Sequence, residues 1–414
     1  MELLNDEQKK IFDLIDMGYN IFITGGAGVG KSFVINLIPK RFHNKKIGIC
    51  SMTGSSAIVI NGTTLHSFMG IGLANGSVEY LVLKIQKNKS ILKKLMYLQL
   101  LVVDEVSMLG DDLFEKINRI FQIIRASEKP FGGLQIVFVG DPFQLSPVNS
   151  KYFFTSREFD STNFKVVTLI KNMRTNELAF KELLDRLRLG ECSETDYLSL
   201  EKLKQTEFAN NIKPTKLYSK RQDVELINNT ELAKLIEMGN KPREYPIKYI
   251  EKLRKKEDMD YIKSFSLSDT ITLCIDAQVV VTRNIDIEAG IINGTRGIVI
   301  NMTDVGVTLK LLNSDEAFIE YISFKPDEFD RKLDFIYMPL KLGWALTIHS
   351  SQGMTLDALE IDLGESIFAC GQAYTGLSRV RNFKSVRVIN LKRRSFKTSK
   401  DVVKFFEEKC SIKE

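Results

Sequence analysis

A glycine-rich loop near the start of the chain constrains its fold more than any other feature. Residues 25–32 read GGAGVGKS; they follow the apolar run IFIT and open the helix-forming run SFVINLIPK. The pattern G-x-x-x-x-G-K-[ST] between a strand and a helix indicates a phosphate-binding loop. Backbone N–H groups would hold the phosphates, Lys31 would reach the β- and γ-phosphates, and Ser32 would bind Mg²⁺. The expected nucleotide contacts are Gly25, Gly26, Ala27, Gly28, Val29, Gly30, Lys31, Ser32 and Phe33.

Two later apolar runs end in polar residues that suit the same chemistry. LQLLVVDEVSM carries Asp104 and Glu105, and LQIVFVGDP is followed by Gln144. Buried parallel strands look like this, with polar residues at their carboxyl ends. We expect Asp104 to hold Mg²⁺ and Glu105 to deprotonate the attacking water, a solvated acidic turn being the alternative. The neutral amide of Gln144 could distinguish ATP from ADP, although a polar loop after a strand has the same pattern.

The composition is that of a water-soluble globular protein. The chain has 414 residues, 44% hydrophobic and 27% charged, and its net charge of +6 permits a phosphate-rich partner. Five scattered cysteines without a CxxC pair argue against a disulfide framework or a zinc site, and fit a reducing compartment. The N-terminus lacks a signal-peptide pattern, and no apolar run approaches the roughly 20 residues that span a bilayer. We therefore expect an intracellular protein without a membrane partner, which would be cytoplasmic if the source is a bacterium, a phage or another virus.

The order of patterns predicts an α/β fold with two main domains. Alternating strands and helices indicate a first domain over residues 1–170, interrupted by a basic insertion at 70–98. A second α/β pattern covers 171–284 and 337–414. Between these two segments, residues 285–336 are rich in β-forming residues and turn signals, which predicts a small β-barrel.

Several motifs in a fixed order resemble one helicase family. GGAGVGKS, VVDEVSM, PFGGLQIVFVGDPFQLSPV, NMRT, TIHSSQGMTLD and GQAYTGLSRV are similar to motifs of the Pif-one (petite integration frequency) family of superfamily-one DNA helicases, relatives of the RecD and Dda types. The resemblance spans about residues 3–385. It departs at Pro142 and Ser146, where the family more often has an aromatic residue and a second proline. It implies two RecA-like P-loop domains with parallel sheets, the barrel being similar to a Src-homology-three domain.

The resemblance also implies the reaction and further nucleotide contacts. ATP hydrolysis, with Mg²⁺ and stimulated by DNA, would drive 5′→3′ translocation on single-stranded DNA and unwinding of duplex. Gln8 would read the adenine edge, a role compatible with a helix-capping box at the same residue. Arg174 and Arg379 would contact the γ-phosphate from the second domain, where guanidinium charge stabilises the transition state. Gly353 would lie at the same nucleotide.

Contacts with nucleic acid are carried over from the same family. The family's strand-contacting segments match Thr53, Gly54, Ser55, His66, Phe68, Thr347, His349, Ser351 and Gln352. Small hydroxyls and loop N–H groups suit phosphate contacts without sequence readout. A structural role is the alternative for each histidine, and Phe68 could anchor a loop instead of stacking on a base. Residues 70–98 occupy the place of the family's strand-separating wedge, a solvated charged face being the alternative.

Two other functions remain open from the sequence. A nucleotide-switched module could grip nucleic acid without unwinding it, or the chain could be an RNA helicase of the same superfamily. We expect single-stranded DNA and fork or overhang duplex DNA as partners. We also expect a monomer, with a DNA-induced dimer as the alternative.

Overall fold

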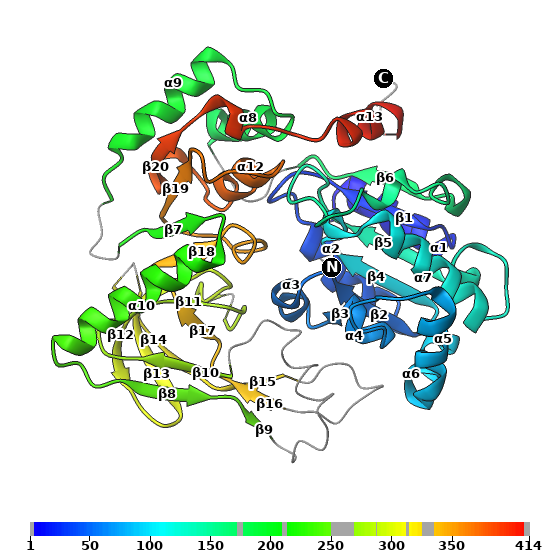
Figure 1. Cartoon of the computed structure of the whole chain (residues 1–414), viewed down its shortest axis with the longest axis horizontal. Coiled ribbons are helices and arrows are strands. Elements are labelled where there is room, and N and C mark those ends of the chain that lie inside the picture. Colours follow the sequence, from blue (N-terminus) through cyan, green and yellow to red (C-terminus); the bar gives the residue numbers. More distant parts are fainter. Residues whose placement is uncertain are drawn as a thin grey trace. The chain divides into compact units, whose positions relative to one another are not determined.

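The computed structural model describes residues 4–171, 177–208, 213–249, 269–286, 288–311, 314–324 and 335–409. The chain forms two compact units (Figure 1). The first contains the described residues up to 171 together with 398–409, and the second contains the described residues from 177 to 397. Each unit has its own parallel sheet, which confirms the predicted α/β class.

The first unit is built on a six-stranded sheet in the order β3-β2-β4-β5-β1-β6, with every pair parallel. β1, β4 and β5 are buried along their whole length, which explains why they read as uninterrupted apolar runs. Since all strands are parallel, their carboxyl ends lie at one edge of the sheet. The strands are β1 (Ile21–Thr24), β2 (Ile47–Ser51), β3 (Thr63–Thr64), β4 (Leu100–Asp104), β5 (Gln135–Val139) and β6 (Lys165–Thr168).

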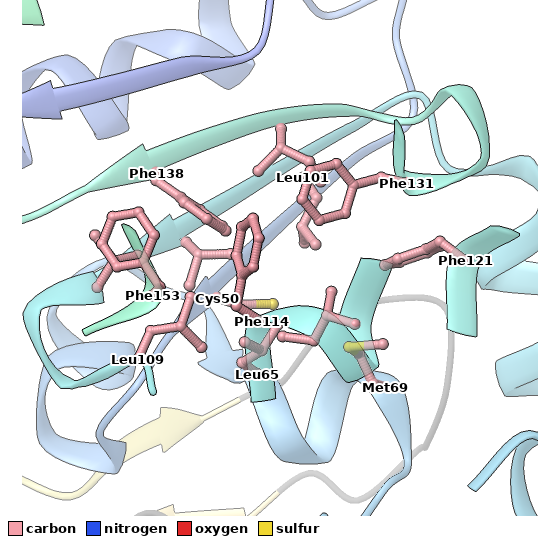
Figure 2. Packing of buried hydrophobic residues seen from close by; sticks show 14 of the residues in the cluster. Cys50, Leu65, Met69, Leu101, Leu109, Phe114, Phe121, Phe131, Phe138 and Phe153 are labelled. Atoms are coloured by element: carbon pink, nitrogen blue, oxygen red, sulfur yellow. The ribbon is translucent and has the colours of Figure 1, made fainter. Parts of the chain in front are cut away.

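Helices cover this sheet, and the predicted helices at the N-terminus and after the glycine-rich loop are both present. The main ones are α1 (Asp6–Asp16), α2 (Lys31–Arg41), α3 (Gly54–Val59), α4 (Leu65–Met69) and α7 (Asp111–Ile124). Short 3₁₀ turns are η1 (Val106–Met108), η2 (Pro130–Gly133), η3 (Phe153–Thr155) and η4 (Asp160–Thr162). Phe114 of α7 lies against Phe131, Phe138 and Phe153, with ring centroids 5.7 to 6.2 Å apart. Figure 2 shows these rings packed with Cys50 and Leu65 in the core.

The basic insertion at 70–98 folds as two helices, α5 (Val78–Lys87) and α6 (Lys89–Tyr97). Ser77 caps α5, and Asn88 caps α6 by accepting hydrogen bonds from the backbone of its first turn. The apolar faces of both helices are buried on the first unit, while most of their lysines are exposed.

The C-terminal helix corrects the expected domain limits. We expected residues 337–414 to belong to the second domain, but α13 (Lys400–Lys409) packs on the first unit. The Phe405 ring stacks on that of Phe154 with centroids 4.3 Å apart, and Phe406 lies 4.8 Å from Phe143. The apolar face of α13 thus covers aromatic residues of the first unit that are more than 240 positions earlier in the chain.

The second unit has a four-stranded parallel sheet in the order β18-β7-β19-β20. Its strands are β7 (Thr215–Tyr218), β18 (Ala345–Thr347), β19 (Leu359–Leu363) and β20 (Val386–Leu391). Helix α10 (Arg221–Glu237) lies against β7 and β18 (Figure 1). The other helical segments are α8 (Leu178–Arg188), α9 (Glu194–Lys202), α12 (Gln372–Leu377), η5 (Leu203–Gln205), η6 (Phe383–Ser385) and η7 (Arg393–Ser395).

Antiparallel strands are inserted between β7 and β18, and they extend beyond the predicted barrel at 285–336. A five-stranded sheet has the order β14-β13-β12-β11-β17, and its strands β11 and β17, which lie outside that range, pair with each other. These strands are β11 (Gln278–Val281), β12 (Arg296–Met302), β13 (Gly306–Leu311), β14 (Glu316–Glu320) and β17 (Leu340–Leu342). Two smaller sheets contain β8 (Arg243–Pro246) with β10 (Thr270–Leu273), and β9 (Lys248–Tyr249) with β15 (Ile322–Phe324) and β16 (Phe335–Tyr337).

Candidate functional site

The glycine-rich loop follows β1 and needs glycine at specific positions. Gly25 has a φ of +142°, and a Cβ there would stand 2.3 Å from the carbonyl oxygen of Leu169. Gly28 and Gly30 have φ values of +82° and +87°, a region that other residues rarely adopt. Gly30 leads into α2, which begins without a side-chain cap. The first turn of α2 therefore presents backbone N–H groups of the kind that bind phosphate at a helix N-terminus.

Lys31 is folded onto this loop. Its Nζ donates hydrogen bonds to the carbonyl oxygens of Gly25 and Gly26 at 2.7 and 2.8 Å. The ammonium is thus held over the loop, where bound phosphate oxygens could replace these carbonyls as its acceptors. Ser32 and Phe33, at the start of α2, are exposed.

Gln8 lies beside the same loop. It is buried, and a capping box joins it to Asn5: the backbone N–H of Gln8 donates to Asn5 Oδ1, and that of Asn5 donates to Gln8 Oε1. The Gln8 Nε2 lies 3.6 Å from the place where a Cβ on Gly30 would stand. The capping role and a position next to the phosphate loop therefore coexist, as the sequence allowed.

The acidic pair at the end of β4 has an unusual backbone and an unusual charge state. Glu105 has φ 57° and ψ 37°, a left-handed conformation that is uncommon for a residue other than glycine and often marks functional sites. Its backbone N–H donates to Asp104 Oδ1 at 2.9 Å. Burial, and next the charge of Glu105, raise the pKa of Asp104 to about 8, while the Lys31 ammonium acts in the opposite direction. The loop lysine is therefore within electrostatic reach of Asp104.

The residues present suit a hard divalent cation. Mg²⁺ prefers oxygen ligands and usually takes one or two carboxylates together with substrate phosphates. The Ser32 hydroxyl and the Asp104 carboxyl are such donors, and a cation would relieve the repulsion between Asp104 and Glu105 that raises the pKa of Asp104. The donor set therefore fits Mg²⁺.

Gln144 follows β5, the strand between β4 and β1 in the sheet. It is buried, and its Nε2 lies 3.4 Å from Asp141 Oδ2, while its backbone N–H donates to the Asp141 carbonyl at 2.9 Å. Asp141 also accepts from the backbone N–H of Phe143 at 3.3 Å. The side chain of Asp141 thus organises the loop that carries Gln144, at the same sheet edge as the phosphate loop and the acidic pair.

The two arginines expected from the second domain have different outcomes. Arg174 lies outside the described residues. Arg379 follows α12 and is 2% exposed; its guanidinium donates to the carbonyl oxygen of Thr375 at 2.8 Å and to the Ser378 hydroxyl at 2.6 Å. A longer contact of 3.4 Å reaches the Ser351 carbonyl. In this conformation Arg379 ties α12 to the segment after β18.

The expected nucleic-acid contacts of the first unit are only partly accessible. Thr53 caps α3, accepting from the Ser56 N–H and donating to the Ser56 hydroxyl, and Gly54 beside it is buried. The side chain of Ser55 lies outside the described residues. His66 is partly buried, which lowers its pKa, so its imidazole is neutral near pH 7.

The expectation that Phe68 contacts nucleic acid is corrected by its packing. Its side chain is 2% exposed and belongs to the core of the first unit. A Cβ on Gly48 would stand 2.4 Å from this ring, and the Lys94 ammonium lies 4.1 Å from its centroid. A base could not stack on Phe68 without unpacking this region, so the ring anchors the segment, as the alternative interpretation held.

In the second unit, the segment after β18 forms a tight turn. The Thr347 hydroxyl accepts from the Ser350 N–H at 2.9 Å, and the Ser351 hydroxyl donates to the Ile348 carbonyl at 2.8 Å. Ser351 and Gln352 are buried, whereas Thr347 and His349 are partly exposed. Burial lowers the pKa of His349, which leaves it neutral near pH 7.

In the described parts of the chain, no helix combines the length and the apolar character that crossing a membrane requires.

Comparison with known proteins identifies the family. A family described as PIF1-like helicase matches residues 3–197. The ATP-dependent DNA helicase Pif1 of Bdellovibrio bacteriovorus is 30% identical over 411 residues, which cover 98% of this chain and 92% of that protein. This chain belongs to the PIF1-like helicase family. The family predicted from the motifs is thereby confirmed.

Solved structures of the PIF1-like family share the whole fold. Bacteroides sp. Pif1 in complex with ADP-AlF4 has a TM-score of 0.84 and 27% identity, and the match covers 99% of this chain and 98% of that one. Bacteroides Pif1 bound to ssDNA has a TM-score of 0.67 at the same identity, covering 99% and 97%. The ATP-dependent DNA helicase PIF1 of Xenopus laevis is 31% identical over 98% of this chain, but this chain spans only 64% of that protein.

Two contributors to the PIF1-like site were not assigned from the sequence. Asp141 holds the Gln144 loop by hydrogen bonds. It could have been found in the sequence from its position, because it is an acidic residue at the end of a buried apolar run. Phe406 of α13 packs on Phe143 of that loop, and nothing in the sequence near Phe406 pointed to this contact.

Proposed function

We propose that this chain is an ATP-dependent DNA helicase that hydrolyses ATP when bound to single-stranded DNA, translocates 5′→3′ and unwinds duplex DNA. The observation that carries this proposal is the meeting of three features at one sheet edge: the loop ending in Lys31, the Asp104–Glu105 pair and Gln144. The ATP-dependent DNA helicase Pif1 of Bdellovibrio bacteriovorus, of which this chain covers 92%, supports the proposal.

The phosphate loop would bind the nucleotide by exchange of hydrogen bonds. Lys31 donates to the carbonyls of Gly25 and Gly26 in the described conformation. Phosphate oxygens would take over as acceptors, because a charge-assisted bond to an anion is stronger than one to a neutral carbonyl. Gln8 would contact the adenine. Ser32 and Asp104 would hold Mg²⁺, and the bound ion would neutralise part of the phosphate charge.

Glu105 would act as general base for the attacking water. Its partly exposed side chain stands next to buried Asp104, so the two carboxyls have different environments and can have different roles. Gln144, held by Asp141, would sense the γ-phosphate with its neutral amide. We therefore propose that Glu105 activates the water for hydrolysis and that Gln144 distinguishes ATP from ADP.

Arg174 and Arg379 would contact the γ-phosphate. The Arg379 guanidinium donates to groups of its own unit, so a contact with the γ-phosphate requires it to exchange the Ser378 hydroxyl or the Thr375 carbonyl for phosphate oxygens. Such an exchange would link nucleotide binding to the segment after β18, because the same side chain approaches the Ser351 carbonyl. This linkage would transmit the nucleotide state to the DNA-gripping segment.

The strand would be held by contacts that do not read sequence. We propose that Thr53, Gly54, Ser55 and His66 contact it in the first unit, and that Thr347, His349, Ser351 and Gln352 contact it in the second. Both histidines are neutral near pH 7, so each would offer a phosphate one N–H donor rather than a positive charge. Helices α5 and α6 of the insertion would serve as the wedge at a fork. We propose a monomer as the active form.

A multiple-turnover ATPase assay with and without single-stranded DNA tests this function. We expect DNA to stimulate hydrolysis in the wild type, and Lys31→Ala to abolish it while leaving the unfolding midpoint unchanged. Lys40→Ala is a matched control, because Lys40 is an exposed lysine at the other end of the same helix. Nucleotide-dependent DNA binding without stimulated turnover would instead indicate a switch module, and stimulation by RNA alone would indicate an RNA helicase.

A further inference from the structure

A pocket lies in the first unit, at the sheet edge opposite the phosphate loop. It has a volume of about 400 Å³, and it is lined by residues of α6, by Phe68 of α4 and by the segment that leads into β2. Lys46 immediately precedes β2, so it stands at the amino end of a parallel strand, whereas the nucleotide site uses carboxyl ends. This pocket is therefore separate from the proposed ATP site.

The charges around this pocket have one sign. Lys46, Lys93 and Lys94 line it, and none of the described residues in its lining carries a carboxyl group. Lys94 is only 8% exposed, so its ammonium is part of the wall rather than a solvated surface charge. Three ammonium groups around a concave surface favour an anion, because the field of like charges adds within a cleft.

The aromatic residues of the pocket are covered by these same cations. The Lys46 ammonium lies 5.0 Å from the centroid of the Tyr97 ring, and the Lys94 ammonium lies 4.1 Å from that of Phe68. A cation over an exposed ring is a weak interaction, and a phosphate is a stronger partner for a lysine. A bound phosphate would thus draw Lys46 away from Tyr97 and leave the face of that exposed ring available to a flat apolar group.

We propose that this pocket binds a nucleoside monophosphate, with the phosphate held by Lys46 and Lys93 and the base lying against the ring of Tyr97. The size fits, because pockets for small ligands run from about 300 to 1,000 Å³. The Ser90 hydroxyl and the apolar side chain of Leu98 also line the pocket and suit the sugar and the base edge. The ligand is either a free nucleotide or the 5′-phosphorylated end of a DNA strand, which present the same chemistry.

The test is a titration with dAMP, followed by ligand-observed NMR, in the Lys31→Ala background, where the phosphate loop has lost its lysine. The double variant Lys46→Gln/Lys93→Gln should weaken dAMP binding by about tenfold or more, since two charge-assisted contacts are lost. Lys87→Gln/Lys89→Gln is the matched control: it removes two exposed lysines of the same insertion that do not line the pocket. Tyr97→Leu should weaken binding of dAMP but not of deoxyribose 5-phosphate. Thermal unfolding of each variant checks its fold.

A second arm separates the two sources of the ligand. Blunt DNA hairpins with and without a 5′-phosphate are compared on the wild type and on Lys46→Gln/Lys93→Gln. If the 5′-phosphate strengthens hairpin binding to the wild type but not to the double variant, the ligand is a strand end. If dAMP binds but the 5′-phosphate does not strengthen hairpin binding, the ligand is a free nucleotide. Absence of dAMP binding under these conditions, or equal losses in both double variants, overturns the proposal. Neither result depends on helicase activity.

Discussion

The contact between the C-terminal helix and the Gln144 loop should control the rate of ATP hydrolysis. The Phe406 ring of α13 lies 4.8 Å from that of Phe143, with the two planes at 54°. Phe143 stands next to Gln144, and both are tied to Asp141 by hydrogen bonds. Phe406→Ala removes the ring that covers this loop but leaves Asp141 and Gln144 unchanged. We expect the loop then to sample positions in which Gln144 does not meet the γ-phosphate.

The geometry sets the size of the effect. A pair of aromatic rings at this separation contributes about 0.5–1.5 kcal/mol beyond the area it buries. If that free energy restrains the loop, its loss lowers the ratio of competent to other loop arrangements about two- to twelvefold at 25 °C. We therefore expect kcat for DNA-stimulated hydrolysis to fall by up to this factor. The KM for ATP should change less than twofold, because the contacts at the phosphate loop and Gln8 are unaffected.

Steady-state ATPase kinetics with saturating single-stranded DNA measure this effect, and two variants of α13 serve as references. Lys404→Ala changes an exposed residue of the same helix and should leave kcat unaltered. Phe405→Ala removes a buried ring stacked on Phe154, which should lower the free energy of unfolding by about 3–5 kcal/mol and reduce kcat at least as much as Phe406→Ala. An unchanged kcat in Phe406→Ala would refute the idea that α13 positions the loop.

Three further substitutions test individual parts of the site. Glu105→Gln should bind ATP and DNA normally but hydrolyse ATP at least about 100-fold more slowly, so rapid multiple turnover would count against the general-base role. Asp104→Asn should abolish turnover yet raise the urea midpoint at pH 8.5 without Mg²⁺. Burial raises the pKa of Asp104 to about 8, so the folded wild type loses stability as the pH rises through that value. The rise in the urea midpoint caused by Asp104→Asn should shrink toward pH 4. A midpoint of this variant below that of the wild type at pH 8.5 would contradict the burial argument. Gly25→Ala should destabilise the protein by about 2–5 kcal/mol, because strain and a clash with Leu169 combine, whereas Gly18→Ala meets nothing within 4 Å and should lose only about 1–2 kcal/mol. Equal losses in urea unfolding would exclude the clash.

Local patterns predicted the strands and the sheet edge that carry the proposed nucleotide site. β1, β4 and β5 are buried on both faces, so each is a short apolar run whose carboxyl end is marked by a change to polar residues. Parallel pairing then brings Lys31, Asp104 and Gln144 to one edge without any further information. The capping box at Gln8 was predicted for the same reason, since it is a pattern of four adjacent residues. The contact of Gln8 with adenine was inferred from the family resemblance and stays a prediction.

Contacts between distant parts of the chain could not be predicted in this way. The amphipathic α13 needs a partner, but nothing in its sequence selects the aromatic residues 143–159 over a surface of the second unit. The β11–β17 pairing joins residues about 60 positions apart and moves the edges of the inserted sheet beyond 285–336. For Phe68 the motif is the same whether the ring faces a base or the core, and only packing against Gly48 and Lys94 decides.

We propose that ATP hydrolysis at the Lys31 site drives this chain along DNA in the 5′→3′ direction. Unwinding of partial duplexes that differ only in a 5′ or a 3′ single-stranded overhang, with Mg²⁺ and ATP, tests it most directly. We predict that the 5′-overhang duplex is unwound, that the 3′-overhang duplex is not, and that Lys31→Ala unwinds neither. Unwinding of the 3′-overhang duplex alone, or DNA-stimulated ATP hydrolysis without unwinding of either substrate, would contradict the account.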